Sequence, residues 1–208
     1  MMFRDREHAA RLLAEALSEY KGKHSLVLAI PRGAVPMGRI IADNLAGELD
    51  VILVRKLPAP SNPEYAIGSV NESGWVYVSD QAAAAGATPE YIEQEKQRQL
   101  AIIRRRRSEY TPLRTPIDRE GRTVIVVDDG LATGATMISA LQGLRARKPE
   151  RLVCAIPVAP MDTIERVKQY ADDIVCLEMP FNFQAVGQFY HDFPQIEDAQ
   201  VIEILHRD

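Results

Sequence analysis

The residues best suited to chemistry are two adjacent carboxylates that stand directly before a turn of small residues. Asp128 and Asp129 follow the apolar run Val124–Val127 and precede the turn at 130–136. Ligands of open α/β sheets bind at the carboxyl ends of the strands, and small residues let backbone N–H groups approach an anion where a helix begins. We therefore predict a phosphate-binding turn formed by Gly130, Ala132, Thr133, Gly134, Ala135 and Thr136.

The surroundings of this turn restrict the kind of phosphate that it can hold. The chain has no G-x-x-x-x-G-K-[ST] segment for a triphosphate, and Gly130–Gly134 does not match the G-x-G-x-x-G pattern of dinucleotide binding. Asp128 and Asp129 lie a sugar's width from the turn, where carboxylates can accept hydrogen bonds from vicinal hydroxyls. These features indicate a pentose 5-phosphate. The alternative is that both acids only cap a turn, but paired carboxylates at the end of a buried strand need partners.

Residues 124–136 resemble the binding fingerprint of the type I phosphoribosyltransferases, in which apolar residues, two acids and a turn containing Thr-Gly hold phosphoribosyl pyrophosphate. The resemblance implies that the turn binds the 5-phosphate and that Asp128 and Asp129 bind the ribose hydroxyls. It also implies a Mg²⁺ cofactor held mainly by the ligand, with Asp128 and Asp129 as candidate metal ligands. Related enzymes give the acid matching Asp129 a part in proton transfer, so Asp129 is a candidate catalytic residue.

A second anion-binding loop is predicted at Pro31–Gly38, which follows the apolar run 25–30 and opens a helix. It resembles the pyrophosphate loop of the family and is closest to the Ser-Arg-Gly-Gly type of xanthine–guanine phosphoribosyltransferase, with Ala34 in place of the second glycine. Arg32 and Gly33 are expected to contact pyrophosphate, because a guanidinium can pair bidentately with its oxygens; Arg32 is the second candidate catalytic residue. The family has a strained peptide bond on one side of the residue that matches Arg32. The alternative is an ordinary strand–helix turn with a solvated arginine.

A basic pair, Arg55-Lys56, closes the predicted strand 51–54. In related enzymes a comparable pair lies near the pyrophosphate and reaches the neighbouring subunit of a dimer, so the resemblance implies both a ligand contact and a homodimer. A solvated basic pair at a strand end is the equally weighted alternative.

The elements that must position these residues alternate between helix and strand. An amphipathic helix is predicted at 5–20 and further helices follow the two anion-binding turns, while the strands are uniformly apolar, which is typical of a parallel sheet covered on both faces. The fold is therefore predicted to be α/β, with a doubly wound, mainly parallel sheet. The remaining predicted strands are 124–127, 152–158 and 174–177. The remaining predicted helices are one that follows the loop at 31–38 and runs to about Leu45, one at 135–147 and one at 162–170.

Two regions interrupt this alternation within what we expect to be a single domain, 1–208. Residues 57–88 are rich in proline and are predicted to form a loop-like lid with a hairpin from 66–70 to 75–78. A long helix at 89–110 should follow, because Thr88 can cap it and Pro89 suits its first position. Residues 180–208 occupy the position of the family's hood, which selects the acceptor; the phenylalanines there are expected mainly to form the core of the hood.

Composition narrows the class of protein. The 208 residues are 46% hydrophobic and carry 25 basic and 29 acidic side chains, a net charge of −4, so we expect a globular protein with no nucleic-acid partner. The charged amino terminus and the absence of a long apolar run predict a cytoplasmic protein that does not enter a membrane. Arg104–Arg107 is expected to form a solvated helix face or an oligomer contact, with RNA binding as the alternative. Cys154 and Cys176 are expected to be buried free thiols.

The resemblance covers most of the chain and implies a Mg²⁺-dependent phosphoribosyltransferase that transfers the phosphoribosyl group to a small nitrogen-containing acceptor, with purine bases as the first class to consider. Two other functions stay open. A regulator could keep the binding turn and sense phosphoribosyl pyrophosphate without turnover, and a hydrolase on the same fold could consume it with water alone. Function belongs to the site rather than the fold, so these three are separated only by what the site does.

Overall fold

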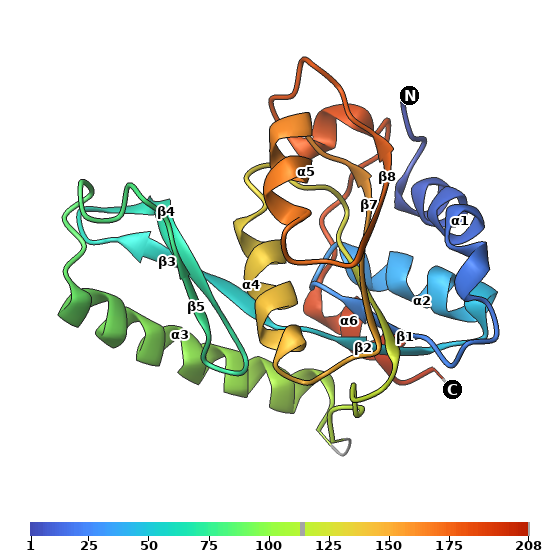
Figure 1. The fold of residues 1–208 in the computed structure, drawn as a ribbon, viewed down its shortest axis with the longest axis horizontal. Helices are drawn as coiled ribbons and strands as arrows, with labels where there is room; N and C mark the ends of the chain where they lie inside the picture. Colours follow the sequence, from blue (N-terminus) through green and yellow to red (C-terminus); the bar gives the residue numbers. More distant parts are fainter. Residues whose placement is uncertain (113–114, 208) are drawn as a thin grey trace.

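A computed structural model describes residues 1–112 and 115–207. Its centre is a five-stranded sheet in the order β2-β1-β6-β7-β8, in which every pairing is parallel (Figure 1). The strands are β1 Leu26–Ala29, β2 Glu48–Val51, β6 Thr123–Val127, β7 Arg151–Val158 and β8 Asp173–Glu178. The predicted parallel α/β sheet is confirmed.

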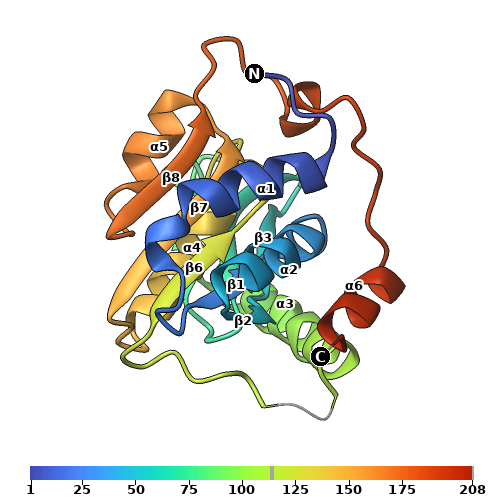
Figure 2. The ribbon, with the colours of Figure 1, turned by 90° about the vertical axis from the view of Figure 1, so that its right-hand side faces the viewer.

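Helices cover both faces of this sheet, which makes it doubly wound. Helices α1 (Arg6–Ala16) and α2 (Ala34–Leu45) lie on one face, and α4 (Ala135–Arg145) and α5 (Met161–Val167) lie on the other (Figures 1 and 2). Successive strand residues point to opposite faces, so each strand contributes to two hydrophobic cores.

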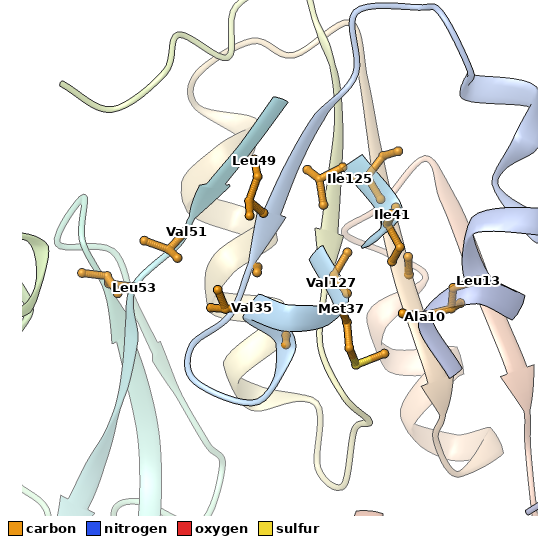
Figure 3. Close-up of a cluster of buried hydrophobic side chains, with 14 of the residues drawn as sticks. Ala10, Leu13, Val35, Met37, Ile41, Leu49, Val51, Leu53, Ile125 and Val127 are labelled. Carbon is orange, nitrogen blue, oxygen red and sulfur yellow. The ribbon is translucent and has the colours of Figure 1, made fainter. Parts of the chain in front are cut away.

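Strand β6 shows how this alternation builds the cores. Ile125 and Val127 pack with residues of α2 such as Met37 (Figure 3), whereas Val124 and Val126 belong to the core that contains α4. All five residues of β6 are buried. Asp128 and Asp129 therefore leave the end of a strand that is fixed from both sides.

The predicted strand at 51–54 is wrong in its bounds. β2 ends at Val51, which is paired with Ala29, and Val54 begins a different strand that is paired with Asn71. Residues 52–53 are the point where the chain leaves the parallel sheet for an antiparallel one. Because the residues at this bend and on both sides of it are apolar, periodicity does not reveal it. The helix predicted at 5–20 likewise ends at Ala16 and is followed by a single 3₁₀ turn, Ser18–Tyr20.

The segment predicted as a loop-like insertion contains most of a second sheet. Strands β3 (Val54–Ala59), β4 (Asn62–Asn71) and β5 (Val76–Val78) form an antiparallel sheet in that order, which projects to one side of the molecule (Figure 1). The predicted hairpin is confirmed, with Val70 opposite Val76. Pro58 lies in β3, an edge strand with a register shift beside this residue, which is where a sheet tolerates proline.

Helix α3 (Pro89–Tyr110) lies along this small sheet and has the predicted bounds and cap (Figure 1). The hydroxyl oxygen of Thr88 accepts a hydrogen bond from the N–H of Tyr91, at 3.2 Å. The described part of the chain contains no helix with both the length and the apolar character needed to cross a membrane.

The arginine run on α3 is not uniformly solvated, which corrects the expectation for Arg104–Arg107. Arg107 donates hydrogen bonds to Asp50 at 2.9 Å and to Glu72 at 2.9 Å, and only 15% of its side chain is exposed. These carboxylates raise the pKa of Arg107 against the effect of its burial. Arg107 therefore ties α3 to the junction of the two sheets, while Arg104 and Arg105 are exposed.

The carboxy-terminal segment crosses back over the molecule. It contains a 3₁₀ turn at Val186–Phe189 and helix α6 (Asp198–Leu205), which packs near α2 and α3 (Figure 2). Phe183 and Phe189 stack with ring centroids 5.4 Å apart and contact the main core, as expected. Phe181 differs because it is fully exposed. Cys154 and Cys176 are free; Cys154 is buried and Cys176 is partly so.

Candidate functional site

The turn after β6, which the sequence predicts to bind phosphate, has backbone N–H groups that the described part of the protein leaves unpaired. Within the residues that the structure describes, the N–H groups of Ala132, Thr133 and Gly134 have no hydrogen-bond partner. Ala132 and Thr133 are exposed and Thr136 is partly exposed. Three free N–H groups at the start of a helix form a good site for an anion.

Gly134 is the residue that lets the chain enter α4 at this point. It is the N-cap of α4 and has φ of 76°, a conformation that glycine adopts without strain. A Cβ atom there would lie 2.9 Å from Cγ2 of Thr163. Ala135 begins the helix as predicted, and Gly130 is buried beneath Val186 of the carboxy-terminal segment.

Two residues outside the predicted turn hold it in place. Thr163 of α5 donates its hydroxyl hydrogen to the carbonyl oxygen of Ala132, at 2.6 Å, and Ser69 of β4 donates to that of Ala135, at 3.0 Å. Both carbonyls are thereby used inside the protein. The N–H groups on the other side of the same peptides remain available to a ligand.

Asp128 and Asp129 lie side by side at the end of β6, as predicted. The N–H of Asp129 donates to Oδ1 of Asp128 at 2.9 Å. Burial raises the pKa of Asp128 well above the ordinary value for aspartate, and the neighbouring charge of Asp129 raises it further. Burial also raises the pKa of Asp129, against the opposing effect of Arg6. Two adjacent, partly buried carboxylates favour a bound cation or hydroxyl donors.

Arg6 is the most important site residue that the sequence does not reveal. Its Nε and Nη2 atoms are both 2.9 Å from Oδ2 of Asp129, and only 11% of its side chain is exposed. Tyr190 contributes from the carboxy-terminal segment, where its hydroxyl donates to the carbonyl oxygen of Asp129 at 2.7 Å. Arg6 precedes Asp129 by 123 residues and belongs to a helix predicted only from its apolar stripe.

The second predicted loop lies against the first. β1 and β6 are neighbours in the sheet, so the residues that follow them meet at one edge. A Cβ atom on Gly33 would lie only 2.1 Å from Oδ2 of Asp129. The peptide bond between Pro31 and Arg32 is cis, which places the unusual peptide of the loop before Arg32.

Arg32 is paired with acids of the carboxy-terminal segment. Its Nη1 atom lies 3.5 Å from Glu197 and 3.8 Å from Asp198, and 28% of its side chain is exposed. Asp198 also accepts a hydrogen bond from the hydroxyl of Tyr110. A pyrophosphate that binds Arg32 must therefore compete with these two carboxylates.

The structure separates the two members of the basic pair. Arg55 faces α3, where its Nε donates to Gln99 at 2.5 Å, and burial together with the charge of Arg106 lowers its pKa. Lys56 is exposed and opposite Ser69 in the antiparallel sheet, so these two side chains share a face. Since Ser69 contacts the first residue of α4, Lys56 is on the side of the phosphate-binding turn and Arg55 is not.

The residues present fit a Mg²⁺ ion that is held mainly by a ligand. The described residues contain no group of three or more His, Cys, Asp or Glu side chains arranged to hold a metal. Asp129 is engaged by Arg6, which leaves Asp128 as the available carboxylate. Mg²⁺ commonly binds one or two carboxylates together with substrate phosphates and water, so this donor set is sufficient for a ligand-borne ion.

Comparisons with known proteins agree with this geometry. The profile of the phosphoribosyl transferase domain matches residues 5–194. The crystal structure of TT1426 from Thermus thermophilus is 44% identical, covers 99% of this chain and 98% of its own, and has a TM-score of 0.84. The Mycobacterium tuberculosis protein named "Putative phosphoribosyl transferase Rv0571c" is 39% identical over 214 residues, which are 100% of this chain and 48% of the relative. The chain thus spans about half the length of the curated relatives it matches.

Proposed function

Because this chain belongs to the phosphoribosyl transferase domain family, we propose that it transfers the 5-phosphoribosyl group of phosphoribosyl pyrophosphate to a nitrogen atom of a small acceptor and releases pyrophosphate. The observation that carries the proposal is the set of free N–H groups at Ala132–Gly134, directly beside Asp128 and the loop at 31–34. Together with Asp128 and the loop at 31–34, which follow neighbouring strands, these groups support a phosphate site, a hydroxyl-binding acid and a second anion loop along one edge of the sheet.

Each part of the site has a physical task in this reaction. The free N–H groups of the turn bind the 5-phosphate, and Asp128 accepts hydrogen bonds from ribose hydroxyls. Arg32 and the backbone of 31–34 bind the departing pyrophosphate, while Lys56 adds positive charge from the small sheet. Bound Mg²⁺ would lower the charge on the leaving group. Catalysis is then mainly positioning and electrostatic stabilisation.

The small sheet and the carboxy-terminal segment supply the two sides that enclose this edge. An oxocarbenium-like centre reacts with water unless water is excluded, so a lid formed by β3–β5 is part of the proposal. The segment from 180 onward is proposed to form the acceptor side, as a hood of the same domain. We further propose a homodimer, because a second subunit often completes the lid and the basic pair in the family, and a cytoplasmic location. Purine bases are the first acceptors to test.

Acceptor-dependent release of pyrophosphate is the expected result when the purified protein is incubated with phosphoribosyl pyrophosphate, Mg²⁺ and a panel of purine, pyrimidine and other nitrogen acceptors. The measurement follows pyrophosphate and nucleotide product. Arg32→Ala should reduce release by about a hundredfold, because a charged donor to the leaving group is lost. Binding without release would instead identify a sensor, and release with water alone would identify a hydrolase.

Tighter binding of pyrophosphate is the expected result of replacing Glu197 and Asp198 by glutamine and asparagine. Both acids compete for Arg32, and 62% and 48% of their side chains are exposed, so the gain should be small, about two- to fivefold in Kd. Titration calorimetry with pyrophosphate and Mg²⁺ measures it. Glu203→Gln on the same helix is the control, because Glu203 pairs only with Arg207 among the described residues. Unchanged or weaker binding in the double variant would contradict the competition.

A further inference from the structure

We propose that Arg6 is a positioning residue for the sugar-binding edge: it fixes the carboxylate of Asp129 and links that carboxylate to the carboxy-terminal hood. This inference rests on the proposed function and adds to it a residue from the opposite end of the chain. It is carried by the contacts of a single guanidinium group.

Every nitrogen of that guanidinium has a partner. Nε and Nη2 bind the same carboxylate oxygen of Asp129 at 2.9 Å each, and Nη1 donates to the carbonyl oxygen of Pro194 at 2.6 Å. The guanidinium carbon lies 3.7 Å from the centre of the Phe193 ring. A planar group that is hydrogen-bonded in its plane and stacked on one face has little freedom to rotate.

This arrangement separates the roles of the two acids. Asp129 is fixed by Arg6 on one side and approached by Gly33 on another, so its orientation is set before any ligand arrives. Asp128 has a hydrogen bond only from the N–H of Asp129 within the described residues, and keeps lone pairs for ribose hydroxyls. Positive charge at Arg6 offsets the negative charge of Asp129 and reduces the repulsion between the two carboxylates.

Arg6 also joins the two sides of the site. Phe193 and Pro194 belong to the carboxy-terminal segment, and Tyr190 of the same segment donates to the backbone of Asp129. Loss of the Arg6 side chain therefore removes one contact to the sugar side and two to the acceptor side at once. A residue that only stabilised α1 would have neither effect.

The test compares Arg6→Gln and Arg6→Lys with Arg11→Gln, a matched change on the same helix where the side chain is 59% exposed and paired with Glu7. We expect Arg6→Gln to weaken binding of phosphoribosyl pyrophosphate with Mg²⁺ by about tenfold and to lower kcat further, since the carboxylate is misplaced. Arg6→Lys should recover part of both losses because it keeps one charged donor. Asp129→Asn should weaken binding and lower kcat much less when it is added to Arg6→Gln than when it is made in the wild-type protein.

Amide exchange separates failure of this inference from failure of the proposed function. Arg6→Gln should raise exchange at 189–194 relative to Arg11→Gln whether or not turnover is detected. Wild-type protein that neither binds nor consumes phosphoribosyl pyrophosphate would overturn the function. Wild-type activity with unchanged binding, kcat and exchange in Arg6→Gln, or additive losses in the double variant, would overturn the role of Arg6.

Discussion

Asp128→Asn is expected to unfold at a higher temperature than the wild-type protein while binding phosphoribosyl pyrophosphate about a hundredfold more weakly. Burial and the charge of Asp129 both raise the pKa of Asp128, so its ionised form costs free energy in the folded state. Asparagine has nearly the same shape and carries no charge. Each unit of pKa shift corresponds to about 1.4 kcal/mol, which is about 3–6 °C in Tm for a chain of this size.

The weaker binding of phosphoribosyl pyrophosphate has a different cause from the gain in stability, because here the charge that is removed is useful. A carboxylate that accepts hydrogen bonds from two sugar hydroxyls is replaced by an amide with one acceptor oxygen, and charged hydrogen bonds contribute about 1.5–3 kcal/mol each. Calorimetry with phosphoribosyl pyrophosphate and Mg²⁺ measures this loss, and scanning calorimetry measures the Tm. A variant that loses binding while it gains stability has lost a functional group and not its fold.

The pH dependence sharpens this prediction. A carboxyl group whose folded-state pKa is raised contributes stability at low pH and loses that contribution as pH rises through the folded-state pKa. The difference in Tm between Asp128→Asn and the wild type should therefore be small in acid and grow as pH rises above the ordinary range of aspartate. Asp43→Asn, at a position 61% exposed beside Arg39, is the control for replacing an aspartate at the surface. A Tm difference that shrinks with rising pH would contradict the assignment.

Asp129→Asn should behave differently, although the two acids are adjacent. Replacing the carboxylate of Asp129 leaves the guanidinium of Arg6, whose side chain is 11% exposed, without that negatively charged partner. An uncompensated buried charge is strongly destabilising. We expect a lower Tm together with weaker binding. Opposite signs of the stability change in the two single variants would identify Asp128 as the group held ready for ligand and Asp129 as the group already engaged inside the protein.

The sequence was sufficient to predict the sheet and the turn because both depend on local order. β6 is a threonine and four apolar residues, followed by two acids and a glycine-containing turn, and the adjacent loop at 31–34 follows another apolar strand. Two neighbouring parallel strands that are each followed by such a turn bring those turns to one edge. Helix α3 was predictable for a similar reason, since Thr88 and Pro89 mark its beginning.

Two features of the site were not predicted from the sequence. One depends on a contact between distant segments, and the other depends on the point where the chain leaves the parallel sheet for the antiparallel one. The partner of Asp129 is Arg6, and no periodicity connects residues so far apart. The division of Arg55 from Lys56 follows from the start of β3 at Val54, because alternation along that strand sends consecutive side chains to opposite faces. The predicted strand 51–54 ends before Arg55 and Lys56, so it gives no reason for their side chains to point to opposite faces. Both residues were therefore predicted to lie near the pyrophosphate.

Gly33→Ala is expected to weaken binding of phosphoribosyl pyrophosphate about a hundredfold without any backbone strain. Gly33 has φ of −56°, which alanine adopts readily, so the effect is one of space. The new methyl carbon would lie 2.1 Å from Oδ2 of Asp129 and 3.1 Å from Nε of Arg6. The carboxylate must move away, which breaks its contacts with Arg6, and a displacement of about 1 Å in a positioning group is enough for such a loss.

Two companion variants separate this effect from a loss of stability. Gly86→Ala places a methyl group in open space at φ of 80°, so it should lower Tm by strain and leave binding unchanged. Asp129→Ala removes the atom that Gly33→Ala collides with. If the collision is the cause, Gly33→Ala added to Asp129→Ala should cost little further affinity, whereas full additivity would show that the methyl group blocks the ligand directly. In the first case the loop at 31–34 acts on the position of Asp129, and the closeness of the two turns is itself part of how the site binds its ligand.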